Sequence, residues 1–240
     1  MKKHVTMESA VANIIRGLLI LSAAFSLHTK NYLNFFTAVM TLWLTFLPFI
    51  IARKNHIKLP QSFQIVILLF IFGAQYLGEL KDYYFRFWWW DKMLHTFSGI
   101  ILGFIGYLLI YVLNNEKKVD VYLSPFFMVF FSFTFAVCVG ALWEIFEFTM
   151  DNTFGLNMQK SGLVDTMWDL IVDCLGAFIS AFCGYQYETR KENGWFKRMF
   201  NAFMKMNRKL FKKKNNHGNR KNHNKGFNID SENDKKNISM

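Results

Sequence analysis

The stretch MLHTFSGIILGFIGYLLIYVL, residues 93–113, decides the fold of this chain. It contains no Asp, Glu, Lys or Arg, and His95 is its one basic side chain. An α-helix needs about 20 apolar residues to cross the hydrocarbon core of a bilayer. Within lipid, a helix also satisfies its backbone hydrogen bonds internally. The stretch therefore predicts a transmembrane helix.

Five other stretches have a comparable length and apolar character. The composition agrees, because 52% of the 240 residues are hydrophobic and only 3 are prolines. We therefore predict an all-α polytopic membrane bundle that occupies residues 1–186 as one transmembrane domain. Its six transmembrane helices are expected at residues 9–27, 33–52, 62–80, 93–113, 124–149 and 165–186.

The first predicted span is unusual because it contains Arg16 and follows Lys2 and Lys3. Basic residues before an apolar stretch are also typical of a signal peptide. The internal arginine and the lack of a small-residue cleavage motif favour a retained span instead. Within the membrane, Arg16 would either extend toward the interface or pair with a carboxylate on another helix.

Basic residues in the loops predict the orientation, because short loops rich in Lys and Arg stay on the cytoplasmic side. In this chain they follow the second, fourth and sixth spans, at Arg53, Lys54, Lys58, Lys117, Lys118 and in the C-terminal tail. The opposite loops carry Lys30, Lys81, Arg86, Lys92 and Lys160. With the tail included, the asymmetry predicts that both termini are cytoplasmic (N-in/C-in).

The net charge of +11 is concentrated at the C-terminal end. Residues from Glu188 onward hold 15 of the 28 Lys and Arg but 5 of the 17 Asp and Glu, so the preceding part is close to neutral. Residues 187–211 have apolar and basic side chains at helical spacing, which predicts an amphipathic helix on anionic inner-leaflet lipids. Residues 212–240 are predicted to form a disordered basic tail. We expect no nucleic acid partner, with RNA binding by the tail as the alternative.

An aromatic segment, KDYYFRFWWWDK at residues 81–92, separates the third and fourth spans. Aromatic rings favour the headgroup region of a bilayer. We therefore expect this segment to anchor the outer end of the bundle in lipid. Stacking of the rings on a substrate is the alternative.

Three of the predicted spans carry acidic or basic side chains on one helix face. They are Asp91 and His95 entering the fourth span, Glu144 and Glu147 near the end of the fifth, and Asp165, Asp169 and Asp173 entering the sixth. Spacings of three, four and eight residues place side chains on the same face of a helix. In the predicted topology all three faces lie at the outer end of the bundle, where Glu79 of the third span joins them.

One imidazole with several carboxylates is a ligand set suited to a divalent metal ion. We predict as metal ligands His95, Asp91, Glu147, Asp173 and Asp165. A metal ion at this position would activate water, and we predict Glu144 and Asp169 as the catalytic acid–base residues. The identity of the ion does not follow from the sequence, and proton relay is the alternative use of the same side chains.

Simpler explanations exist for most of these residues. Asp91 and Asp165 could cap the N-termini of their helices, and His95 could be a hydrogen-bonded interior histidine. Asp173 is harder to explain, because eight residues place it about 12 Å deeper than Asp165. An isolated carboxylate at that depth costs about 2.5 to 3.5 kcal/mol. Asp173 is therefore expected to face the bundle interior and to have a partner.

Glycines accompany the polar faces. Gly99, Gly140 and Gly176 each lie within about one turn of one of these side chains. Small residues allow transmembrane helices to approach closely. They predict tight packing of the fourth, fifth and sixth spans.

The motifs WDKMLHTFSG, GALWEIFEF and DTMWDLIVDCLGA resemble those of the YjdF-like family of bacterial inner-membrane proteins. Their order, Asp-Lys-x-x-His, then Glu-x-x-Glu, then Asp-x-x-x-Asp with a following glycine, is similar more distantly to that of VanZ-like proteins. The resemblance covers residues 60–186. It implies a multi-pass protein of the bacterial plasma membrane with a shared polar site, and it does not imply a particular reaction.

Three functions are compatible with these features. The first is a metal-dependent hydrolase or transferase that acts on lipid or envelope intermediates. The second is a non-catalytic membrane scaffold in which the polar side chains only fix helix packing. The third is a cation- or proton-coupled transporter, although the sequence shows neither an inverted repeat nor a clearly broken helix.

Overall fold

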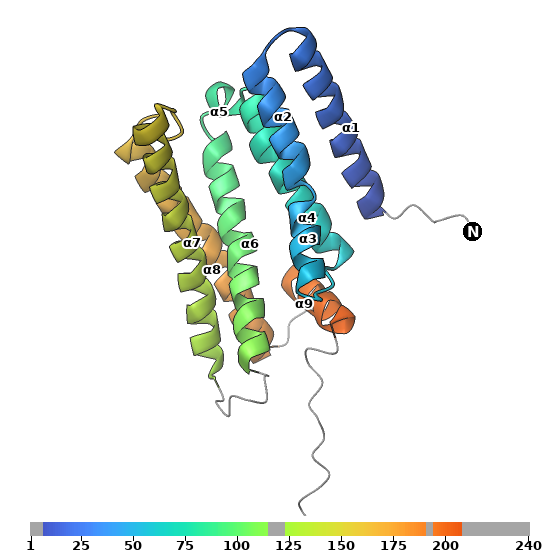
Figure 1. Ribbon diagram of the computed structural model, residues 1–240. Coiled ribbons are helices and arrows are strands. Elements are labelled where there is room, and N and C mark those ends of the chain that lie inside the picture. The colour runs from blue at the N-terminus through green and yellow to red at the C-terminus, as the bar shows by residue number, and fades with distance from the viewer. Residues whose placement is uncertain (1–6, 115–122, 191–193, 208–240) are drawn as a thin grey trace, which may run out of the picture.

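The computed structural model describes residues 7–114, 123–190 and 194–207, which form a bundle of helices (Figure 1). In chain order these are α1 (Met7–His28), α2 (Tyr32–Leu44), α3 (Leu47–Lys54), α4 (Gln61–Ile71), the π-helix η1 (Phe72–Leu80), α5 (Tyr83–Arg86), α6 (Trp90–Asn114), α7 (Pro125–Phe154), α8 (Leu163–Arg190) and α9 (Trp195–Met206). Six helical segments are long and apolar enough to cross a membrane, with α2–α3 and α4–η1 each forming one. The predicted all-α, six-span bundle is confirmed.

The described helices pack in two groups. In one group α6, α7 and α8 all contact one another, and in the other α1 contacts α2 and α4 while α2 contacts η1 (Figure 1). Contacts between α6 and η1 join the two groups. The three polar faces predicted from the sequence therefore belong to helices of a single packed group.

Close approach of α6 and α8 depends on two glycines. A Cβ atom added to Gly99 would lie 2.5 Å from the carbonyl oxygen of Asp173, and one added to Gly176 would lie 2.2 Å from that of Thr96. Both distances are far inside van der Waals contact, and the obstructing atoms belong to the backbone. The predicted tight packing of these spans is therefore found, and it leaves no room for a side chain at either position.

The second span is interrupted between α2 and α3. Pro48 has no N–H to continue the α2 hydrogen-bond ladder, which accounts for the break. The guanidinium of Arg16 stabilises it: Nε donates to Oγ1 of Thr45 at 3.1 Å, and Nη2 donates to the Thr45 carbonyl at 3.4 Å. The guanidinium carbon also lies 3.9 Å from the centre of the Phe46 ring. Arg16 was expected to extend toward the interface or to pair with a carboxylate. It instead donates hydrogen bonds to Thr45, at the break between α2 and α3.

The third span changes geometry in its C-terminal half. After α4 the chain continues as the π-helix η1, whose hydrogen bonds are wider than those of an α-helix and which is a rare form often found near functional sites. A Cβ at Gly78 would lie 2.4 Å from the Tyr84 ring, so this glycine allows the ring to pack on η1. Burial raises the pKa of the Tyr84 hydroxyl. The prediction that no span is clearly broken is therefore wrong for the second span, and the third span is irregular as well.

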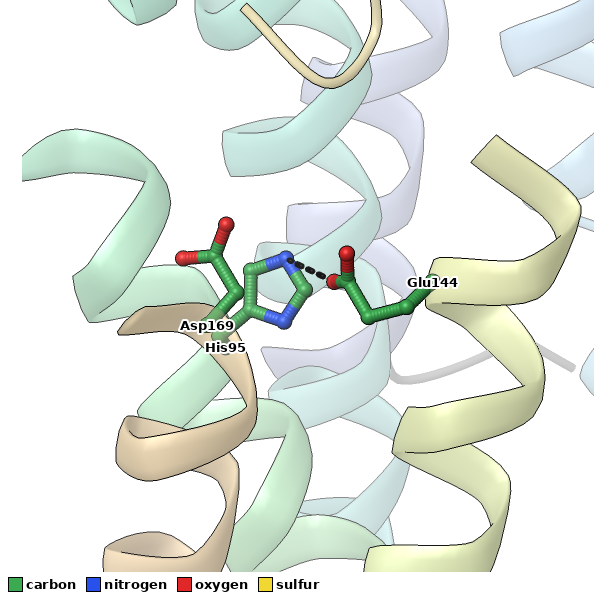
Figure 2. Close-up of side chains that lie close together, drawn as sticks. All are labelled: His95, Glu144 and Asp169. Atoms are coloured by element: carbon green, nitrogen blue, oxygen red, sulfur yellow. Dashed lines mark ion pairs between the residues drawn. The ribbon is translucent and has the colours of Figure 1, made fainter. Parts of the chain in front are cut away.

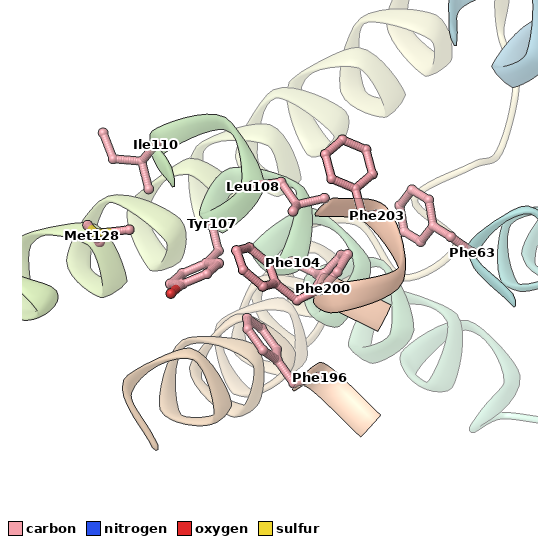
Figure 3. Packing of buried hydrophobic residues seen from close by; sticks show 9 residues of the cluster. All are labelled: Phe63, Phe104, Tyr107, Leu108, Ile110, Met128, Phe196, Phe200 and Phe203. Atoms are coloured by element: carbon pink, nitrogen blue, oxygen red, sulfur yellow. The ribbon is translucent and has the colours of Figure 1, made fainter. Parts of the chain in front are cut away.

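The amphipathic helix predicted at 187–211 is found as α9, preceded by a longer α8. Its rings Phe196 and Phe200 pack against Tyr107 of α6, and Phe203 is buried in the same cluster (Figure 3). The apolar face expected to enter lipid thus packs largely on the protein. Asn207 fastens the end of the helix, because its side chain accepts from the Lys58 N–H and donates to the Lys58 carbonyl, both at 2.7 Å. Residues 208–240, including the predicted disordered tail, lie outside the described part.

Candidate functional site

His95 is the centre of the polar cluster. It lies in the second turn of α6 and is 8% exposed. Its Nδ1 atom is 3.3 Å from Oδ2 of Asp173 on α8, and its Nε2 atom is 3.8 Å from Oε1 of Glu144 on α7. Oδ1 of Asp91, one turn earlier on α6, is 3.9 Å from the same Nε2. Side chains from all three helices therefore converge on one imidazole.

Asp173 is held in place by more than its contact with His95. Its other oxygen, Oδ1, accepts a hydrogen bond of 2.9 Å from the Ser98 hydroxyl. On the α7 side, a Cβ at Gly140 would lie 2.4 Å from Oδ2, so the absence of a side chain there makes room for the carboxylate. Asp173 is 2% exposed. The prediction that this residue faces the interior with a partner is correct, and its position suits orienting the imidazole.

Three ligand atoms, one each from His95, Glu144 and Asp169, lie within 4.8 Å of one another, and all three residues are buried (Figure 2). Both carboxylate oxygens of Glu144 and Oδ1 of Asp169 are buried without a hydrogen-bond partner. The nearest polar neighbours of Glu144 include the His95 ring and the Thr166 hydroxyl. Buried carboxylate oxygens without partners are rare and costly, so this group has the features of a site for a cation.

A second group of ligand atoms within 4.8 Å of one another comes from Asp91, Asp165 and Asp169. Two of these carboxylates contact lysines. Nζ of Lys160 donates to Oδ2 of Asp91, and Nζ of Lys92 lies 3.5 Å from Oδ1 of Asp165. Both aspartates are in the first turns of their helices, as capping requires, but their side chains contact lysines, and Asp91 also lies near His95. The two lysines pair with Asp91 and Asp165, and no lysine contact is found for Asp169, which belongs to both groups, or for Glu144, within the described residues.

Two residues of the predicted cluster lie apart from these groups. Glu147 is half-buried one turn beyond Glu144, and its Oε1 accepts from the indole N–H of Trp143 at 2.9 Å. Glu79 is exposed on η1. Neither belongs to a group of ligand atoms among the described residues. The other predicted site residues either belong to one of the two groups or, like Asp173, contact His95.

Lys160 belongs to the loop that joins α7 and α8 and covers the cluster. Gly155 and Gly162, with φ of 64° and 66°, bound this loop in a backbone conformation that favours glycine. The carboxylate of Asp151 accepts from the N–H groups of Met158 and Gln159, which shapes the loop. Nζ of Lys160 also lies 4.5 Å from the centre of the Tyr84 ring.

Sequence reasoning did not identify Ser98, Lys92 and Lys160 as members of the cluster. Ser98 lies three residues after His95, so helical spacing could have shown that it shares a face with this residue. The two lysines were assigned only to the orientation of the loops. No pattern in the chain indicates that the Lys160 loop folds back over α6.

The family described as predicted membrane proteins (DUF2238) matches residues 11–190. The chain belongs to this family. Its membership confirms the resemblance to YjdF-like proteins. A protein of Thermotoga maritima that is described only as uncharacterised is 28% identical over 144 residues, which make up 60% of this chain and 72% of that protein. No solved structure matches the chain.

Proposed function

We propose that His95, Glu144 and Asp169 bind a divalent cation, and that this DUF2238 protein uses it to hydrolyse or transfer an ester group of lipid or lipid-linked envelope intermediates. The observation that carries the proposal is the buried group of three ligand atoms from three different helices. Three of its four carboxylate oxygens lack a hydrogen-bond partner. A cation would supply the interaction that these oxygens lack.

The geometry requires only a small closure around the ion. Two ligands bound at about 2.0–2.2 Å lie at most about 4.4 Å apart, and calcium ligands at 2.3–2.6 Å lie at most about 5 Å apart. The three ligand atoms lie within 4.8 Å of one another. Side-chain movements of less than about 1 Å would therefore bring them into coordination of either kind of ion.

The proposal revises the roles predicted from the sequence. Glu144 and Asp169, expected as acid–base residues, become ligands beside His95. Asp173, expected as a ligand, becomes the residue that orients His95 through the 3.3 Å contact. A carboxylate behind a ligating histidine fixes its tautomer and raises its basicity.

A cation in this position would lower the pKa of a bound water and polarise an ester. In hydrolysis, the water oxygen forms a bond to the acyl carbon or phosphorus, and the bond from that atom to the leaving oxygen breaks. The water proton ends on the leaving oxygen. Asp91, whose Oδ1 is 3.9 Å from Nε2 of His95, is placed to carry that proton. Water is the only co-reactant required.

Substrate access would follow movement of the loop that carries Lys160. The cluster is buried, and this loop is bounded by two glycines with positive φ. Lys92 and Lys160 at its rim favour a substrate with an anionic group, such as a lipid phosphate. In the predicted orientation, with cytoplasmic termini, the substrate would belong to the outer leaflet of the bacterial plasma membrane.

Metal content tests this proposal directly. The purified full chain, freed of metal by chelation, is reloaded with Zn²⁺, Mn²⁺ or Ca²⁺ and analysed by mass spectrometry of the elements. We expect about one ion per chain, lost in His95→Ala and Asp169→Asn. Glu79→Gln removes an acidic group at the same end of the bundle but outside both groups, and it should retain the ion. A wild-type protein that takes up no ion would overturn the proposal.

Transport of a cation or proton is the second candidate. It is favoured by the break at Pro48 and the π-helix η1, because transporters often bind substrates beside interrupted helices. Uptake into liposomes would test it, with Asp173→Asn as the variant. Ion-dependent uptake that the substitution leaves unchanged would remove this candidate.

A further inference from the structure

A cavity of about 970 Å³ lies at the end of the bundle opposite His95. Its walls come from the end of α3, the segment that joins α3 to α4, the first turn of α4 and the end of α9. Pockets of about 300–1,000 Å³ are large enough for a small organic ligand. The cavity is separate from the polar cluster, which lies near the beginning of α6.

Basic side chains line this cavity. Arg53, His56, Lys58 and Lys205 all contribute to it, and its lining includes no Asp or Glu. Within the described part of the chain, no carboxylate lies within ion-pair distance of Arg53, Lys58 or Lys205. Four basic groups around one volume repel one another unless an anion lies between them. The charge of the lining therefore selects an anionic ligand.

Apart from Gln64 and Asn207, the rest of the lining is apolar and includes Phe49, Ile57 and Met206. The walls α3 and α4 are parts of the second and third membrane spans. The cavity thus combines cationic groups with an apolar wall at the end of two spans. A ligand with a phosphate and a hydrocarbon portion matches both surfaces.

The cavity is formed by contacts that do not involve its charged groups. Asn207 of α9 bonds to both backbone groups of Lys58, and α9 itself is anchored by buried rings such as Phe200. At the end of α3, Ile57 N–H donates to the Ala52 carbonyl and His56 N–H to that of Arg53, the pattern of a Schellman motif. Substitution of the charged side chains should therefore leave the walls in place.

We propose that this cavity binds the phosphate of an anionic phospholipid, with Arg53, His56, Lys58 and Lys205 as its ligands for the headgroup. The lipid would occupy the leaflet on the side of α9. Bound there, it would join α9 to the α3–α4 segment. This site is independent of the cation site and goes beyond the proposed function.

Native mass spectrometry of the full chain in a neutral detergent provides the test, with dioleoyl phosphatidylglycerol and dioleoyl phosphatidylcholine as probes. We expect phosphatidylglycerol to bind at least tenfold more tightly. Each Lys or Arg near an anionic lipid contributes about fivefold in affinity. The double variant Arg53→Gln/Lys58→Gln should therefore lose about 25-fold.

Two further variants make the test specific. Lys54→Gln removes one charge from an exposed lysine of the same helix that does not line the cavity, and it should retain binding. His56 has a φ of 56°, where glycine is favoured, so His56→Gly removes the imidazole without straining the backbone. It should weaken binding while the protein stays folded.

Two results would overturn the proposal. One is equal binding of the two lipids, or equal loss in the double variant and in Lys54→Gln. The other concerns the source of the phosphate. Inorganic phosphate is added as a competitor at concentrations up to about 10 mM, which is enough to saturate a site that binds it with a Kd of about 1 mM. If it displaces phosphatidylglycerol completely, the ligand is a soluble phosphate compound and not a lipid.

Discussion

Nδ1 of His95 lies 3.3 Å from Oδ2 of Asp173, at the point where α6 and α8 approach most closely through Gly99 and Gly176. The contact joins packing to chemistry. The glycines bring the two backbones together, and the same approach places the carboxylate behind the imidazole. A substitution that alters the packing of α6 on α8 should therefore also alter the contact between Asp173 and His95, and so affect cation binding.

Asp173→Asn tests the chemical side of this contact. The amide has the size of the carboxylate and can still accept from Ser98, so the fold should be retained. We expect affinity for Mn²⁺ or Zn²⁺ to fall about 10- to 100-fold, the usual effect of losing a partner behind a metal-bound histidine. Isothermal titration calorimetry measures this change.

Asp82→Asn is the matched control, because Asp82 is exposed in the loop before α5 and, within the described residues, forms an ion pair with Arg86 alone. It should bind the ion as the wild type does. An Asp173→Asn protein with unchanged affinity and a lowered melting temperature would favour the scaffold, in which the polar side chains serve packing alone.

Gly140→Ala tests the space that α7 leaves for Asp173. The new methyl group would lie 2.4 Å from the carboxylate, so the Asp173 side chain must leave its present position beside His95. We expect cation affinity to fall by at least tenfold, the usual effect of losing a partner behind a metal-bound histidine. Gly17→Ala is the control, because a Cβ at this position meets no atom within 4 Å.

Much of this arrangement could be predicted from the sequence. The six spans follow from stretches of about 20 apolar residues, helical spacing placed Asp169 and Asp173 on one face of their helix, and the cost of a carboxylate in lipid indicated that Asp173 faces the interior. These features are local, because each depends on one helix and on the cost of placing a charge in lipid.

The parts that could not be predicted depend on how helices contact one another. The sequence does not indicate that Lys160 reaches Asp91, or that Glu147 lies outside both ligand groups. The position of α9 was also missed, since a basic amphipathic helix suits a lipid surface as well as an apolar protein surface. Phe104 and Tyr107 of α6 provide that protein surface.

Gly176→Ala tests the packing of α6 on α8. The added Cβ would lie 2.2 Å from the Thr96 carbonyl oxygen, which belongs to the backbone and cannot rotate away. The helices must separate, so we expect a large loss of thermal stability and of protein that elutes as a single peak in size-exclusion chromatography. Gly17→Ala is again the control and should be neutral or slightly stabilising. Equal stability of the two variants would show that the close approach is not required.

Lys160→Met tests the electrostatic role of the loop over the cluster. Lys160 contacts Asp91, and its charge opposes a cation bound nearby. At an effective dielectric constant of about 20, a unit charge and a divalent cation separated by about 10 Å repel each other by about 3.3 kcal/mol before screening. We therefore expect tighter binding of Mn²⁺ or Zn²⁺, by about tenfold after screening by salt. Titration calorimetry at low ionic strength measures it.

Lys30→Met removes a lysine from an exposed loop that is predicted to lie on the same side of the membrane, and it controls for the change in net charge. Its cation affinity should equal that of the wild type. Weaker binding in Lys160→Met would mean that the loop supports the ligands rather than opposing the ion. In that case the cation would bind with the loop closed, and the loop would be a part of the site instead of its cover.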